Sequence, residues 1–306
     1  MKKFLNFTLL ASCFAFGGCS QTTSPLSTSP VSVKEAVAQP APDLVAEVAE
    51  VSVPAAEEPA KPMKVKYVAQ AKKWGTLRAK FVVDGKVAEP TKVNAAADPV
   101  CAALGIMTEN LIVGKDGAIK NLAIYMDKKS KVKDVHPDLE KPAAAPLVLD
   151  NKNCVFVPHV QFVRPGQSID VKNSDTTGHN ANFSFFENDA VNFLVPSMGM
   201  KNLPILKEEP GTIEVQCNVH PWMKAYLIIQ ELPYCGITGE DGVLEIANLP
   251  VGQVTFRAWH ELGKLDEVTV GGKKEKWSKN RFDFEIKEGM NDLGTVKISA
   301  DKFIKK

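Results

Sequence analysis

The sequence predicts an all-β protein, because short runs of alternating apolar and polar residues are separated by turn residues. Val254–Trp259 and Phe282–Ile286 alternate in this way, as half-buried strands do. Asp84-Gly85 and Asp116-Gly117 are typical of hairpin turns between strands. Ala95–Leu104 is the stretch for which we expect one small helix. About 240 residues follow the N-terminal region, which is long enough for two modest domains.

The N-terminus has the features of an export signal. Met1–Lys3 is basic and Phe4–Phe16 is apolar, the length of a secretory signal and too short for a membrane span. Residues 1–19 form the expected signal segment, and Gly17-Gly18-Cys19 resembles the lipobox of bacterial lipoproteins. The resemblance implies that cleavage makes Cys19 the mature N-terminus and that Cys19 is acylated. Processing at Cys13 and plain secretion without a lipid remain alternatives. We therefore expect an exported, lipid-anchored protein of the periplasm, outer membrane or cell envelope.

Two segments, a tether and a β-rich lead-in, are expected between the signal and residue 146. Residues 20–66 are rich in Ser, Thr, Pro, Ala, Val and Glu, so we expect a disordered tether that lets an anchored head reach outward. Residues 67–145 contain strandlike runs at Thr76–Val83 and Leu122–Met126. We predict that this β-rich lead-in packs on the following domain, at residues 146–231.

A compact motif organises that domain. Cys217, His220 and Met223 stand in the order Cys-x-x-His-x-x-Met, in a loop between two strandlike segments. His179 lies upstream at the end of another strandlike segment, where a second strand of a sandwich can bring it to the loop. A thiolate, two imidazoles and a weak thioether form the ligand set that favours copper in electron-transfer sites. Taken singly, each residue is more often a core or hydrogen-bonded side chain.

The residues from Val157 to Met223 resemble the cupredoxins, the small blue copper proteins. The resemblance implies a Greek-key β-sandwich with one type 1 copper ion held by the four residues named above. It also implies that Asn180 ties the two ligand loops together. Val219 stands where family members with this loop carry proline. Its N–H is expected to reach the Cys217 sulfur and to raise the reduction potential.

Residues 232–306 form the expected last domain. Glu240-Asp241-Gly242 and Asn248-Leu249-Pro250 resemble the hairpin and corner of carboxypeptidase regulatory-like, transthyretin-like sandwiches, which are usually not catalytic. His260-Glu261 begins a zinc-peptidase signature, but Lys264 stands where its second histidine is required, so we reject that enzyme class.

The cysteines outside the motif suggest one disulfide. If Cys19 is acylated and Cys217 holds copper, Cys101, Cys154 and Cys235 remain in an oxidising compartment. We favour Cys101–Cys154, with Cys235 unpaired, although the sequence allows all three pairings.

These observations predict a carrier of single electrons between redox proteins, and not an enzyme. Electrons are expected to enter at the exposed edge of His220, with Pro221 and Trp222 as the apolar rim where a partner docks. The 37 basic and 36 acidic residues leave no basic field for nucleic acid, and five histidines are too few for a multicopper oxidase or nitrite reductase. We expect a monomeric head on a lipid anchor in the membrane. The alternative is a copper storage or delivery protein, or a cell-surface structural protein on the same fold.

Overall fold

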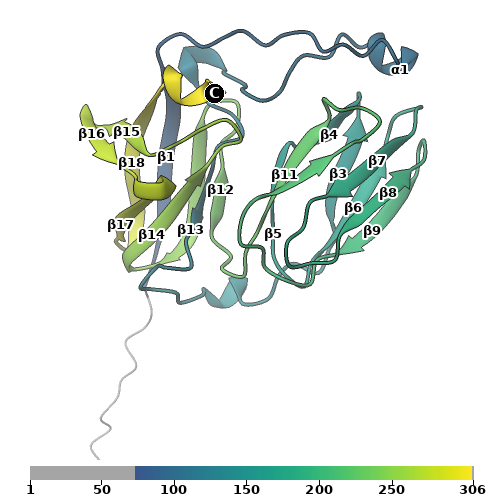
Figure 1. The fold of residues 1–306 in the computed structure, drawn as a ribbon. Coiled ribbons are helices and arrows are strands. Elements are labelled where there is room, and N and C mark those ends of the chain that lie inside the picture. The colour runs from purple at the N-terminus through teal and green to yellow at the C-terminus, as the bar shows by residue number, and fades with distance from the viewer. Residues whose placement is uncertain (1–72, 305–306) are drawn as a thin grey trace, which may run out of the picture. The chain divides into compact units, whose positions relative to one another are not determined.

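The computed structural model describes residues 73–304, which form four β-sheets, the short helix α1 (Pro99–Ala102) and a few 3-10 turns (Figure 1). The predicted all-β class is confirmed. The expected signal segment 1–19 with Cys19, and the expected tether 20–66, lie outside the described residues. Within 73–304, no helix is long and apolar enough to cross a membrane.

Two of the sheets pack face to face in what we call the central sandwich. Its first sheet has the order β5-β11-β10-β7-β8 and its second the order β4-β3-β6-β9. Both sheets place alternate apolar side chains in one shared core. The strands are β3 (Leu147–Lys152), β4 (Val155–Val157), β5 (Val160–Val163), β6 (Ser168–Asn173), β7 (His179–Phe183), β8 (Val191–Val195), β9 (Met200–Pro204), β10 (Ile213–Gln216) and β11 (Lys224–Ile229).

The other two sheets form what we call the flanking sandwich. Its sheets have the orders β13-β1-β18-β15-β16 and β12-β2-β14-β17. Their facing side chains share a second core, in which Phe81, Phe256 and Trp277 are among the largest buried residues. The strands are β1 (Trp74–Asp84), β2 (Ala123–Met126), β12 (Cys235–Ile237), β13 (Val243–Pro250), β14 (Gly252–Trp259), β15 (Glu267–Val270), β16 (Lys273–Lys276), β17 (Arg281–Ile286) and β18 (Gly289–Ser299).

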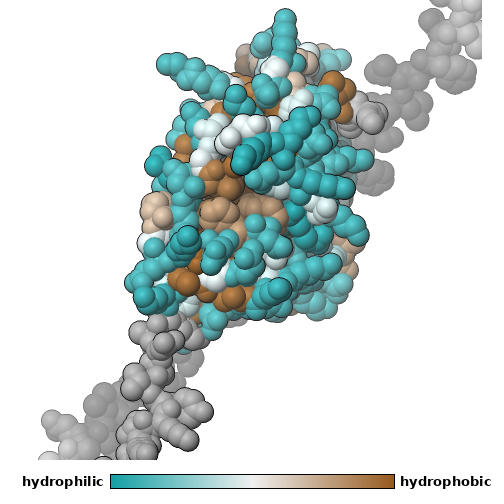
Figure 2. Space-filling view, turned by 90° about the vertical axis from the view of Figure 1, so that its left-hand side faces the viewer, coloured by the Kyte–Doolittle hydropathy of each residue, from teal (hydrophilic) through white to brown (hydrophobic). Residues whose placement is uncertain are grey.

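The alternation read in the sequence is present in this sandwich. In β14, Val254, Phe256 and Ala258 are buried while the residues between them are half-buried. Figure 2 shows one face of the molecule, on which hydrophilic residues in teal predominate around smaller hydrophobic areas. Many apolar members of the strands are buried in the two cores.

The predicted separation of the lead-in, residues 67–145, from the last domain, residues 232–306, is wrong. β1 does not form a hairpin at Asp84-Gly85. It lies antiparallel to β13 and parallel to β18, so it is an inner strand of the flanking sandwich. β2 likewise pairs with β12 and β14. Residues 232–306 thus bury their core only together with strands from the expected lead-in, because Leu77 and Phe81 fill the space between the two sheets.

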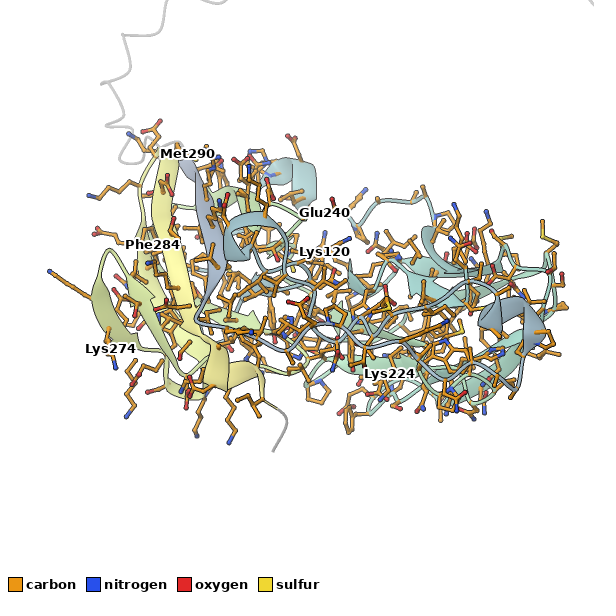
Figure 3. The ribbon with its side chains drawn as sticks, turned by 90° about the horizontal axis from the view of Figure 1, so that it is seen from above. Lys120, Lys224, Glu240, Lys274, Phe284 and Met290 are labelled. Atoms are coloured by element: carbon orange, nitrogen blue, oxygen red, sulfur yellow. A yellow bond between two sulfur atoms is a disulfide. The ribbon has the colours of Figure 1, made fainter. Side chains whose placement is uncertain are left out.

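The connection between β1 and β2 does reach the central sandwich, as predicted for the lead-in. Ala95, Cys101 and Ile106 are buried in the core of that sandwich, and the connection carries α1, which is shorter than the expected helix (Figure 1). On its way back, Lys120 forms an ion pair of 3.4 Å with Glu240, both labelled in Figure 3. One continuous segment therefore contacts both sandwiches.

Candidate metal centre

The loop between β10 and β11 brings three of the predicted ligands onto one short segment. β10 and β11 pair antiparallel up to Gln216 and Lys224. The Cys217 N–H donates to the Met223 carbonyl at 3.1 Å, and the Met223 N–H donates to the His220 carbonyl at 2.8 Å. These two bonds close the loop, with Cys217 and Met223 at its two ends and His220 in the middle, and all three side chains are buried.

β7 supplies the other predicted ligand. It pairs with β10, with Phe183 opposite Val215, and it begins at His179. His179 Nδ1 lies 2.9 Å from His220 Nδ1, and Cys217 Sγ lies 3.7 Å from the same His220 nitrogen. Ligand atoms of His179, Cys217 and His220 all lie within 4.8 Å of one another. The two separated segments therefore converge, as the sequence predicted.

Each imidazole has a carboxylate on its other nitrogen. Asp175 Oδ2 lies 2.9 Å from His179 Nε2, and Asp98 Oδ2 lies 3.0 Å from His220 Nε2. A carboxylate accepts only, so each neutral ring carries its proton on Nε2, and its lone pair at Nδ1 faces the other histidine. Two such acceptors at 2.9 Å repel each other unless a cation lies against both. The histidines are thus arranged as metal ligands whose outer nitrogens are held by carboxylates.

Sequence reasoning missed both carboxylates. Asp175 precedes His179 by four residues in the loop after β6, where it also accepts the backbone N–H groups of Asn153 and Cys154 at 2.7 and 2.8 Å. Asp98 lies 122 positions before His220. The only local signal is Asp98-Pro99, which is typical of a helix start and says nothing about a distant histidine.

The electrostatics of the site follow from its burial. Burial lowers the pKa of His179, and the hydrogen bond to Asp175 opposes that effect only in part. Desolvation raises the pKa of Asp98, but hydrogen bonds from Thr177, His220 and the start of α1 outweigh it, so its pKa lies below the ordinary value. Asp98 is therefore ionised near pH 7, the form that accepts a hydrogen bond, and His179 is neutral, the form that can bind a metal ion.

Asn180 joins the two ligand segments through its side chain, as the resemblance implied. Its Oδ1 accepts the backbone N–H groups of Asn218 at 2.7 Å and Val219 at 3.3 Å, and it lies 3.4 Å from Cys217 Sγ. The expected bond from the Val219 N–H to the Cys217 sulfur is therefore wrong. That N–H is directed to Asn180 because the loop turns its backbone toward β7.

The predicted exposed edge of His220 is also wrong. Only 2% of His220 is exposed, because Asp98 covers its Nε2 and the Cys101 sulfur lies 3.8 Å from the same atom. Trp222 is half-buried, and its indole N–H donates to the Cys154 carbonyl at 3.0 Å. Pro221 and Val219 are exposed on the loop. The sequence could not show this cover, because it comes from the connection between β1 and β2.

The favoured disulfide is confirmed. Cys101 and Cys154 are bonded, with Cα atoms 5.6 Å apart, and Cys235 is free. Cys235 lies in β12, and burial raises the pKa of its thiol. His159, which we did not assign as a ligand, is buried and pairs with Glu261 at 2.6 Å.

The donor set fits copper. A buried thiol that becomes a thiolate on metal binding, two imidazole lone pairs and a buried methionine on the same loop form a soft and borderline set. Zinc sites of similar size more often use further thiolates or carboxylates as direct ligands. Here the carboxylates face the outer nitrogens instead.

No protein-family model and no curated protein matches this sequence. Among solved structures, a mutant of amicyanin in the Cu(I) form is similar over 34% of this chain and 100% of its own, with 17% identity and a TM-score of 0.26. A copper-containing nitrite reductase from Thermus scotoductus is similar over 32% of this chain and 27% of its own, with 19% identity and a TM-score of 0.27.

Proposed function

We propose that this chain is a type 1 copper protein that accepts and passes on single electrons. One observation supports this most: the Cys217 sulfur and the Nδ1 atoms of His179 and His220 converge in a buried site whose outer nitrogens are held by carboxylates. Bound copper would supply a one-electron couple. Cys217, His179 and His220 would hold it, with Met223 as a weak fourth ligand.

The surroundings of the ligands suit such a carrier. Asp175 and Asp98 fix the two imidazole rings, Asn180 fixes the loop that carries Cys217, and the core of the central sandwich excludes water. A preorganised site changes little between oxidation states, which keeps the reorganisation that accompanies electron transfer small. We therefore propose a carrier and not an enzyme.

The proposal extends to the rest of the chain. The signal-like N-terminus and Cys19 support export and lipid anchoring at the cell envelope, and redox proteins are the proposed partners. The flanking sandwich is proposed to be a non-catalytic module similar to carboxypeptidase regulatory-like domains. The second candidate is copper storage or delivery, which the thiol and the exposed methionines Met198 and Met200 favour.

Visible spectroscopy of the copper-loaded protein separates the two candidates. An electron carrier should show an intense blue Cu(II)–thiolate band that is lost in Cys217→Ser and retained in the matched variant Cys235→Ser. A storage or delivery protein should hold Cu(I), remain colourless and release the ion to a chelator. A Cu(II)-loaded protein that lacks the blue band, and whose visible spectrum is unchanged in Cys217→Ser, contradicts the proposal.

A further inference from the structure

We propose that residues 94–104, here called the cap, close the outer edge of the metal centre and that Asp98 is the positioning residue that holds His220. This inference rests on the proposed function, since it concerns how the same site is shielded. The edge of His220, which the sequence led us to expect at the surface, is then covered by the cap.

Asp98 uses its two carboxylate oxygens for two different tasks. Oδ1 accepts the backbone N–H groups of Val100 at 2.8 Å and Cys101 at 3.3 Å, so it caps the start of α1. Oδ2 accepts from His220 Nε2 at 3.0 Å and from Thr177 Oγ1 at 2.8 Å. The start of the helix and the ligand are therefore fixed by one side chain, and Thr177, which lies two residues before His179, fixes that side chain in turn.

The disulfide secures the cap beside this carboxylate. Cys101 is bonded to Cys154, and its sulfur lies 3.8 Å from His220 Nε2. The backbone of Cys154 donates to Asp175 at 2.8 Å and accepts from the Trp222 indole at 3.0 Å. The cap is thus joined to both carboxylates and to the ligand loop. Because Cys101 and Cys154 are fully buried, a dithiol has little access to the bond.

A closed edge has consequences for both metal and partner. His220 cannot swing outward without breaking its bond to Asp98, so the metal cannot leave with this ligand through the capped side. Slow release suits an electron carrier and opposes a delivery role. The exposed part of the ligand loop is instead Asn218, Val219 and Pro221, of which Val219 has 60% of its surface exposed. Partners therefore have access to this part of the loop and not to His220.

The reactivity of Cys217 in the metal-free protein tests the cap without copper. The variants are Asp98→Ala and the double variant Cys101→Ser/Cys154→Ser, with Asp138→Ala as matched control, since Asp138 is an exposed aspartate 3.7 Å from His136. Iodoacetamide labelling is followed by mass spectrometry of the peptide that contains Cys217, with the peptide that contains Cys235 as internal reference. Asp98→Ala loses the charge-assisted bond to His220, and the double variant loses the disulfide that secures the cap. Labelling should be at least about tenfold faster in both variants and unchanged in the control.

A second variant keeps the helix cap and tests positioning alone. In Asp98→Asn, an amide oxygen still caps α1, but an amide donor now faces His220 Nε2–H. The ¹⁵N shifts of the His220 ring should then report the proton on Nδ1, where the wild type has it on Nε2.

The rate of metal release gives a third test. Cu(I) removal by a bathocuproine chelator should be at least about tenfold faster in Asp98→Ala than in wild type.

Unchanged labelling in folded Asp98→Ala and in the double variant, or an unchanged His220 tautomer in Asp98→Asn, overturns the inference. If the wild type binds copper without the thiolate band, the proposed function fails, whereas the labelling and tautomer results still decide on the cap.

Discussion

Replacing Asn180 by alanine should loosen the loop Cys217–Met223 while leaving the central sandwich folded. The variant loses three hydrogen bonds: two from the backbone N–H groups of Asn218 and Val219 to Oδ1, and one from Nδ2 to Asn192 Oδ1. It also loses the contact with the Cys217 sulfur. Each neutral bond contributes about 1 kcal/mol net. Because Asn218 and Val219 are exposed, water can replace part of the loss. We expect the free energy of unfolding to fall by about 1–2 kcal/mol.

Urea denaturation of the metal-free protein, followed by circular dichroism, measures this loss. The matched control is Asn192→Ala, which removes only the 2.8 Å bond between the two amide side chains on the outer face of β7 and β8. It should cost about 0.5 kcal/mol or less. Amide hydrogen exchange at Asn218 should speed up in Asn180→Ala alone. A loss below about 0.5 kcal/mol together with unchanged exchange at Asn218 refutes the assigned role of Asn180.

Three further predictions concern other parts of the molecule. Burial lowers the pKa of His260 from 6.5 to about 4, so the stability that neutral His260 contributes to the fold is complete above pH 6.5 and is lost as the pH falls toward 4. His260→Gln should therefore flatten the pH dependence of the free energy of unfolding in that window by up to about 1.4 kcal/mol per pH unit. An unaltered slope contradicts this. Glu209→Gln should lower the free energy of unfolding by about 2–3 kcal/mol, since the buried carboxylate accepts hydrogen bonds from N–H groups of residues 186–188. A urea midpoint equal to that of wild type contradicts this prediction. Residues 232–306 alone should show no cooperative thermal transition, because β1 supplies Leu77 and Phe81 to their core; a sharp transition of that fragment would restore the original domain boundary.

The candidate ligands were predictable because their chemistry is local. Cys217, His220 and Met223 lie in one short loop, and their side-chain types restrict the choice of metal. His179 needed only the assumption that two strands of a sandwich are neighbours, and the pairing of β7 with β10 bears it out. Asn180 followed from the resemblance.

The groups around the ligands were not predictable, because they depend on long-range packing. Asp98 and Cys101 reach His220 through a connection that belongs to neither sheet of the central sandwich. A sequence pattern reports that Thr76–Val83 is a strand, but not which strands lie beside it, so β1 was placed in the wrong sandwich. The same limit left three disulfide pairings open, of which the structure contains Cys101–Cys154.

X-ray absorption spectroscopy of the copper-loaded protein, recorded in both oxidation states, tests the central claim most directly. The claim predicts one short copper–sulfur distance and two imidazole nitrogens around a single copper ion, with little change on reduction, and loss of the short sulfur distance in Cys217→Ser. A copper ion surrounded by nitrogen and oxygen alone, or one whose spectrum is the same without the Cys217 sulfur, contradicts it.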